Sequence, residues 1–221
     1  MFKSKGEKKP DLLSAALWVF LALSMDIIVH IILSNTMQNE TFSRDIAGKS
    51  ITTIIWLITI IIVIRYNKRN KIFSIKAIEN GRKWLVTYAF IVLIMIVINL
   101  LLKGYGTVQL IHEFTMFTDK YESSGIIVFI IQIAYYLCEA ALATFIIIFG
   151  QAWGEKKFEN QMIPYGGVVM AITWGGIHFL SKDIVVGIYG IGMSLLIGVG
   201  YLVARKIPMY AYILALIIFV V

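Results

Sequence analysis

The sequence predicts an all-α fold, a bundle of about seven transmembrane helices with its N-terminus in the cytoplasm. Hydrophobic residues make up 59% of the chain and charged residues only 15%, and the mean hydropathy is +0.84. Soluble domains carry about 25% charged residues. Here the charged residues stand in short clusters between long apolar runs, as in a multi-pass membrane protein.

Seven apolar runs approach the length of about 20 residues that a membrane-spanning helix needs. The second run is short, and we expect its helix to begin near Ala47 if the side chain of Lys49 extends to the interface. Six spans with one interfacial or re-entrant segment is the alternative count. The predicted spans are Leu12–Leu33, Ser50–Ile64, Trp84–Leu102, Gly125–Gly150, Ile163–Leu180, Ile184–Ala204 and Ile207–Val221.

The first run follows a basic N-terminal segment, as a signal peptide does. The run is too long for a signal-peptide core, and no small-x-small cleavage site follows it, so we expect a retained span. Between the third and fourth spans, residues 103–123 mix charged and apolar side chains. This loop is predicted to lie partly on the membrane surface as an amphipathic turn of helix.

The fourth and fifth spans carry the polar residues discussed below. The sixth, Ile184–Ala204, is rich in glycine, which suits tight helix contact. Pro164 and Pro208 stand near the starts of the fifth and seventh spans, where a missing backbone N–H costs little.

The basic residues predict the orientation, because Lys and Arg near span ends stay in the cytoplasm. With the N-terminus inside, fifteen of the 20 Lys and Arg residues fall in cytoplasmic segments. The other five fall outside, at Arg44, Lys49, Lys103, Lys120 and Lys182. The net charge of +7 therefore indicates contact with anionic lipid and not with nucleic acid. We expect the protein to be located in a cell membrane, namely the bacterial cytoplasmic membrane.

The only cysteine, Cys138, lies within an apolar run, which excludes an intrachain disulfide and a cysteine-based metal cage. The sequence contains no soluble domain and no convincing internal repeat. Residues 1–221 therefore form a single integral membrane domain.

Asp26 and His30 are spaced i, i+4 in the first span and share one helix face. The pair is either a proton relay, or half of a metal site, or a satisfied polar pair that fixes helix packing. The packing interpretation is favoured, because one helix cannot supply enough metal ligands.

Gln132, Tyr136 and Glu139 form one polar stripe on the fourth span. A carboxyl group in a bilayer is a functional-site hypothesis by default. Glu139 fits equally well as a general base and as a protonated structural carboxyl group that donates a hydrogen bond.

Trp174 and His178 share a face of the fifth span, beside Gly175 and Gly176. The two glycines permit close helix approach or a local bend. The group is either part of an active site or a packing notch that ends in an interfacial histidine.

From Gln132 onward the chain resembles the CAAX protease and bacteriocin-processing family of intramembrane endopeptidases. That family has a Glu-Glu-x-x-x-Arg motif, a Phe-x-x-x-His motif and a final His-x-x-x-Asn or Asp motif on separate helices. Glu139 and His178 match its catalytic glutamate and first histidine. The other motif positions hold Ala140, Thr144, Trp174, Leu216 and Val220.

The resemblance implies a core of four helices over residues 124–221, preceded by three spans and the outer loop in residues 1–123. It also implies that Glu139 activates a water molecule and that His178 stabilises the oxyanion. The family's second histidine is missing, and loss of one such donor costs about 10²-fold to 10³-fold in rate. We also expect Leu216 and Val220 to make the pocket wall apolar.

Two functions follow from this resemblance. The first is a non-catalytic or weakly active relative that binds a peptide or a membrane-protein partner, as in bacteriocin immunity. The second is an active endopeptidase with catalytic Glu139 and His178 and with Gln132, Tyr136 and Trp174 as binding residues. If the fourth helix continues through Gln151 to Lys157, Glu139 and His178 are expected at one level in the outer half of the membrane.

No cofactor is expected, and a divalent metal at Glu139 and His178 would lack ligands. A proton-coupled or ion-coupled transporter that uses Asp26, His30 and Glu139 is favoured least, because the sequence shows no inverted repeat and no pair of broken helices. The oligomeric state, like the partner, does not follow from the sequence.

Overall fold

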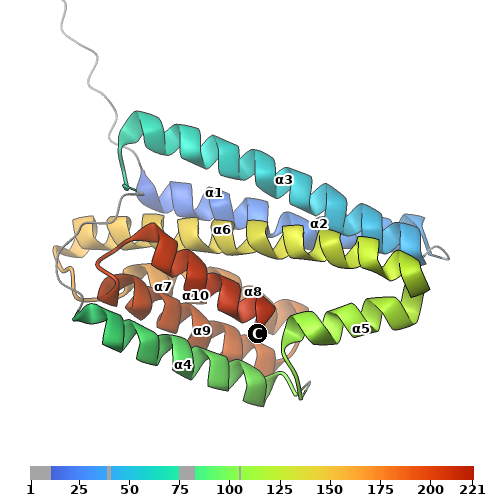
Figure 1. Cartoon of the computed structure of the whole chain (residues 1–221). Coiled ribbons are helices and arrows are strands. Elements are labelled where there is room, and N and C mark those ends of the chain that lie inside the picture. The colour runs from blue at the N-terminus through green and yellow to red at the C-terminus, as the bar shows by residue number, and fades with distance from the viewer. Residues whose placement is uncertain (1–10, 39–40, 75–82, 105) are drawn as a thin grey trace, which may run out of the picture.

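The computed structural model describes residues 11–38, 41–74, 83–104 and 106–221, and within these ranges all regular structure is helical. Five helical stretches are long and apolar enough to cross a membrane: Leu12–Thr36, Thr41–Asn70, Trp84–Leu102, Gln109–Phe158 and Ile184–Val203. The predicted all-α membrane bundle is confirmed at this level. In Figure 1 the long helices run roughly along one direction, and α5 lies below the start of α6 at the right-hand end, which we call the α5 end.

The first stretch contains two helices, α1 (Leu12–Leu23) and α2 (Met25–Thr36), with a break at Ser24. Asp11 begins α1, because its side chain accepts a hydrogen bond from the Ser14 backbone N–H at 3.3 Å. At the break, the Ser24 hydroxyl donates to the Phe20 carbonyl oxygen at 2.9 Å, a local bond that often bends helices. The break therefore lies just before Asp26.

Helix α3 (Thr41–Asn70) has 30 residues and begins well before the predicted Ser50. The sequence criterion ended this span at its charged residues, but a helix can include polar residues wherever other helices cover them. The half-buried side chain of Lys49 lines the cavity described below.

Helix α6 (Gly125–Phe158) is the central helix of the bundle. It packs against α1, α3 and α5, and on its other side against α7 and α10. From Leu142 to Gly150 every residue is buried, which explains the unbroken apolar run in this part of the sequence. The helix continues through Lys157, as the alignment of Glu139 with His178 required.

The predicted fifth span is interrupted. It consists of α7 (Tyr165–Met170), the π-helical turn η2 (Ala171–Gly175) and α8 (Gly176–Ser181). Single π-helical turns inside α-helices often occur at functional sites. Trp174 lies in the turn, and His178 follows one turn later.

Glycines allow α9 (Ile184–Val203) to pack closely on this interrupted span. A Cβ atom at Gly175 would lie 2.9 Å from the Ile191 backbone nitrogen, and one at Gly198 would lie 2.6 Å from the Gly167 Cα. The tight helix contact predicted for the glycine-rich sixth span is therefore present. Asp183 begins α9 by accepting from the Val186 backbone N–H at 2.9 Å.

Two further helices complete the bundle. Helix α4 spans Trp84–Leu102, as predicted, and α10 spans Pro208–Val220 with Pro208 in its first turn. The loop between the third and fourth predicted spans contains the amphipathic helix α5 (Gln109–Tyr121), followed by the short turn η1 (Glu122–Ser124). The helical turn predicted for this loop is thus confirmed and is longer than expected.

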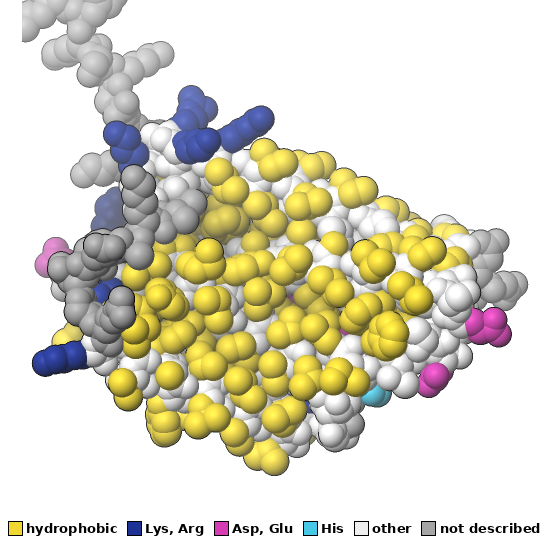
Figure 2. Space-filling view, in the orientation of Figure 1, with side chains coloured by type: hydrophobic (Ala, Val, Ile, Leu, Met, Phe, Trp, Pro, Cys, Tyr) yellow, Lys and Arg dark blue, Asp and Glu magenta, His cyan; other side chains and the backbone are white. Residues whose placement is uncertain are grey.

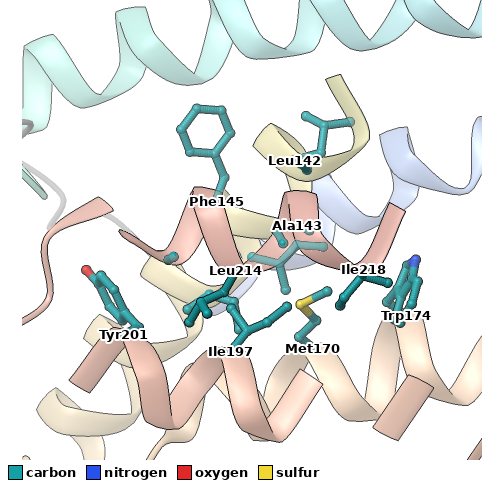
Figure 3. Close-up of a cluster of buried hydrophobic side chains, with 14 of the residues drawn as sticks. Leu142, Ala143, Phe145, Met170, Trp174, Ile197, Tyr201, Leu214 and Ile218 are labelled. Carbon is teal, nitrogen blue, oxygen red and sulfur yellow. The ribbon is translucent and has the colours of Figure 1, made fainter. Parts of the chain in front are cut away.

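The apolar core lies between α6, α7, α9 and α10, whose side chains meet in Figure 3. Ala143, Met170, Ile197 and Leu214 are fully buried there. Trp174 lies at one end of this cluster and also lines the cavity described below. It therefore connects the apolar core with the polar site.

Candidate functional site

A cavity of about 710 Å³ lies inside the bundle. Its lining residues come from α1, α2, α3, α5, α6, α8, α9 and α10, from the π-turn, and from the end of α4. Along α3, α6 and α9 they belong to the half of the helix nearer the α5 end, as Gly48, Gln132 and Val186 do. The cavity therefore occupies that half of the bundle.

All seven side chains that the sequence singled out line this one cavity. They come from three segments far apart in the chain and are Asp26 and His30, then Gln132, Tyr136 and Glu139, then Trp174 and His178. The convergence of the three groups could not be read from sequence spacing. It makes the cavity the candidate functional site.

Glu139 lies deep in this cavity. The Trp174 side chain lies within hydrogen-bonding reach of its carboxyl group, and the carboxyl group of Asp26 is close enough to repel it. The positive charges of Lys49 and Lys182 attract the Glu139 carboxylate and so oppose this repulsion. A single acidic residue predicted on α6 is thus part of a charged group drawn from four segments.

His178 is held in one orientation. Its Nδ1 atom lies 2.6 Å from the Trp174 carbonyl oxygen, and the two rings lie 4.4 Å apart between centroids. A carbonyl oxygen can only accept, so Nδ1 carries a proton and Nε2 is the free acceptor of the neutral ring. Among the described residues, no hydrogen bond or ion pair joins His178 to Glu139.

Asp26 and His30 share the cavity. Asp26 accepts a hydrogen bond from the Thr52 hydroxyl at 3.4 Å, and the Tyr135 hydroxyl lies beside it. In the described ranges no hydrogen bond joins Asp26 to His30, whose side chain is exposed. The polar neighbours of Asp26 thus come from α3 and α6, and the role of the Asp26 and His30 pair stays a prediction.

Sequence reasoning missed Lys49 as a site residue. Its charge is attracted by the carboxylates of Asp26, Asp45, Glu113 and Glu139. Its ammonium group also lies 5.5 Å from the ring centre of Phe117 and 5.6 Å from that of Tyr135, a cation–π arrangement. A lysine near the end of an apolar run looks interfacial in sequence, and only the packing of α2, α5 and α6 around it reveals burial.

Helix α5 is joined to the bundle by a hydrogen-bonded chain that the sequence also did not reveal. The Tyr136 hydroxyl donates to Glu113 and accepts from Gln109 Nε2 at 2.6 Å. Gln109 Nε2 also donates to Glu113 at 2.9 Å. The i, i+4 spacing of Gln109, Glu113 and Phe117 on an amphipathic helix was the available signal, because it places all three on the face toward α6.

Lys103, just after α4, extends this chain. Its ammonium group donates to the Gln109 side chain and to the Ile218 carbonyl oxygen near the end of α10. Burial lowers the pKa of Lys103 to about 8, and the attraction of Glu113 and Glu139 partly opposes this. Lys103 follows the C-terminus of α4, where a cation is favourable. Its two hydrogen bonds link α4 to α5 and α10.

The wall provided by α10 differs from the prediction. Leu216 and Val220, which were expected to line the pocket, do not reach it, and Ile218 and Phe219 do. Phe219 stacks on Tyr136 with ring centres 5.6 Å apart. The wall is apolar as expected, with different residues, because the helical rotation of α10 was assigned from a motif that this chain lacks.

In the part of the chain that the structure describes, no group of three or more His, Cys, Asp or Glu side chains is arranged to hold a metal ion. The carboxyl groups of Asp26 and Glu139 both attract the charge of Lys49.

Fold and site together define a class: a helical membrane protein with a charged cavity in one half of its bundle. Comparisons with protein-family models, with curated proteins and with solved structures give no match to this chain.

Proposed function

We propose that this membrane protein binds a polar or charged segment of a peptide or of a membrane-protein partner in the cavity, without cleaving it. One observation carries the proposal: polar side chains from six helices converge on a cavity of about 710 Å³. Ligand pockets are typically about 300–1,000 Å³. The cavity is lined by four carboxylates, two histidines and four basic side chains, Arg44, Lys49, Lys103 and Lys182.

Absence of cleavage is proposed because α10 contributes only apolar side chains. Ile218 and Phe219 are the lining residues on this helix, and the motif positions that hold polar residues in CAAX proteases, a histidine donor among them, are Leu216 and Val220 here. A buried oxyanion without that donor is costly. We therefore propose a relative of that family that keeps Glu139 and His178 but has apolar Leu216 and Val220 at the last motif positions.

We further propose seven membrane crossings with the N-terminus in the cytoplasm, in a bacterial cytoplasmic membrane. The five long apolar stretches are five of these crossings, and the interrupted segment α7–α8 and the shorter α10 are the other two. Figure 2 supports the orientation: Lys and Arg gather at one end of a broad apolar surface, whereas Asp and Glu appear at both ends of this face. By the positive-inside rule the basic end is cytoplasmic, and the cavity opens toward the outside.

A photo-crosslinking residue tests the binding function. Placed at Ile177, which lines the cavity, it should yield peptide or protein adducts in the native membrane, with masses that do not change over time. The same residue at Ile188, which is 61% exposed on α9 and lies outside the cavity lining, should yield lipid adducts. Lipid adducts alone at both positions would remove the support for a peptide or protein partner.

An active endopeptidase is the second candidate, and one observation favours it. Glu139 and His178 share the cavity, and the Trp174 carbonyl oxygen leaves His178 Nε2 free. The purified chain would be incubated with a quenched-fluorescence peptide library beside Glu139→Ala and His178→Ala. Cleavage by the wild-type chain that both variants lose would replace the binding function with the enzymatic one.

Transport was favoured least partly because broken helices were not expected. That reason is wrong, since the helices are interrupted at Ser24 and at Ala171–Gly175, and both interruptions contribute cavity residues. Transport is still placed third. A transporter needs a second opening on the opposite side of the membrane. Among the described residues, the cavity lining does not extend to the basic ends of α3 and α6, where that opening would lie.

A further inference from the structure

Two buried acceptor atoms beside the cavity have no hydrogen-bond donor among the described residues. Gln132 is 4% exposed, yet its Oε1 atom has no hydrogen-bond partner, and neither has Glu113 Oε2. The carboxyl groups of Asp26 and Glu139 lie nearby. Buried acceptors without donors are rare and call for an explanation.

These carboxylates are not neutralised by close ion pairs. Among the described residues, ion pairs shorter than 4 Å such as Lys120 with Asp45 and Lys206 with Glu155 do not include Asp26, Glu113 or Glu139. Asp26 receives its hydrogen bond from Thr52 at the long distance of 3.4 Å. A carboxylate offers about four acceptor positions, so Asp26 and Glu139 keep capacity for further N–H donors.

Lys49 shows that this cavity accommodates an ammonium group. It is drawn toward four carboxylates and lies over the rings of Phe117 and Tyr135. Trp174 and Tyr135 provide further aromatic surface next to Glu139 and Asp26. Carboxylates, aromatic rings and an amide oxygen are the groups that recognise a compact organic cation with several N–H donors.

We propose that Asp26, Gln132, Tyr135, Glu139 and Trp174 form a binding site for a primary ammonium group, with Lys49 as its internal competitor. This assignment rests on the proposed function and names what the partner inserts: a lysine side chain or a free amino terminus. The three N–H donors of the ligand bond to Asp26, Glu139 and the Gln132 oxygen. Trp174 and Tyr135 cover the methylene groups beside the charge.

The competitor gives the proposal its most specific consequence. If the site binds cations, removal of the Lys49 charge frees the carboxylates that it attracts, and ligand affinity rises. If the cavity binds anions through Lys49, the same change weakens binding. Lys49→Met therefore changes affinity in opposite directions under the two assignments.

The test uses the full chain in nanodiscs of phosphatidylcholine and phosphatidylglycerol, which lack primary amines. Binding of acetyl-Ala-Lys-Ala-amide is measured by calorimetry, beside peptides with norleucine or glutamate in place of lysine. We expect the lysine peptide to bind about tenfold more tightly than the norleucine peptide, as for a charge-assisted hydrogen bond. Asp26→Asn and Glu139→Gln should each weaken it about tenfold, and Lys49→Met should strengthen it severalfold.

Asp119→Asn is the matched control, since this exposed carboxylate on α5 lies outside the cavity lining, and it should leave the affinity unchanged. Equal binding of all three peptides, tighter binding of the glutamate peptide, or weaker binding by Lys49→Met would each overturn the proposal. If a carboxylate variant does not fold, Lys49→Met still decides, because it removes a half-buried charge and adds no new polar group.

A lipid headgroup is the other source of a primary ammonium group. Nanodiscs that contain phosphatidylethanolamine distinguish the sources: competition by the lipid weakens peptide binding at least severalfold, whereas a peptide-specific site is unaffected. Protein crosslinks at Ile177 without binding of the lysine peptide would leave the proposed function standing and remove the ammonium site. Binding of the lysine peptide without protein crosslinks would keep the ammonium site and remove the support for the proposed function.

Discussion

The Trp174 carbonyl oxygen lies 2.6 Å from His178 Nδ1, and the rings of the two residues lie 4.4 Å apart. Both contacts are made across a π-helical turn. The extra residue in that turn changes the angular relation between Trp174 and the helix that follows. The turn thus lets one indole contact the core, the imidazole and the Glu139 carboxyl group together.

Trp174→Ala is predicted to destabilise the fold severely, because this side chain is only 5% exposed. Replacing a buried aromatic residue by alanine costs about 3–5 kcal/mol. Trp18→Ala is the control, since Trp18 is 71% exposed on α1, and it should change stability by less than about 0.5 kcal/mol. Thermal unfolding of both variants in the same detergent measures the difference, and equal effects would contradict the packing described.

Gly175→Ala and Gly176→Ala form a second matched pair. A Cβ atom at Gly175 would meet the Ile191 backbone nitrogen at 2.9 Å, whereas one at Gly176 meets its nearest atom at 3.9 Å. We expect a loss of about 1–3 kcal/mol for Gly175→Ala from overpacking. At about 2–4 °C per kcal/mol for a chain of this size, the melting temperatures should separate clearly. A larger loss for Gly176→Ala would show that α9 does not contact the π-turn in this way.

Tyr136→Phe is predicted to loosen α5. The lost hydroxyl leaves Glu113 and Gln109 with unsatisfied groups, at a cost of about 1–3 kcal/mol. Tyr212→Phe removes only a 3.3 Å bond to the Leu137 carbonyl oxygen and serves as the control. Hydrogen exchange should become faster in α5 for the first variant alone. Unchanged exchange in α5 would contradict the role of this hydrogen-bonded chain.

Lys103 predicts a pH dependence with a definite sign. Its pKa in the folded chain is about 8, below the value of 10.5 for a free lysine. Between these values the unfolded chain binds more protons, so the stability contributed by this group rises with pH. We expect a gain of about 1–3 kcal/mol from pH 7 to pH 10. Lys103→Arg keeps its charge throughout and should lack the gain, and an equal gain in both proteins would assign it to other groups.

Much of the fold could be predicted because hydropathy alone locates apolar helices. Helix α4 has the predicted ends, and α9 and α10 differ from theirs by only one or two residues. The start of α3 could not be located in this way, since Lys49 and Asp45 lie within the helix and are covered by α5. The π-turn at Ala171–Gly175 could not be predicted either, because these residue types are compatible with a π-helical turn and with an α-helical turn. Gly175 and Gly176 indicated only close helix approach or a local bend.

The site was predicted residue by residue but not as a whole. Glu139, His178 and Asp26 stood out because charged or titratable groups are rare in apolar runs. Their meeting point depends on the rotation of α2, α6 and α8 about their axes, which no spacing within one helix determines. Lys49 and Glu113 looked like interfacial charges for the same reason.

The central claim is that a charged cavity inside the membrane opens at the α5 end and is electronegative where Glu139 lies. Cysteine accessibility tests it most directly. In a Cys138→Ala background, Ile177→Cys places a thiol in the cavity lining and Ile188→Cys places one on the outer surface of α9. Impermeant cationic and anionic thiosulfonates would be added from outside to intact cells. The account predicts that Ile177→Cys reacts, about tenfold faster with the cationic reagent, while Ile188→Cys stays unmodified in the lipid. Absence of reaction at Ile177→Cys, or a preference for the anionic reagent, would contradict it.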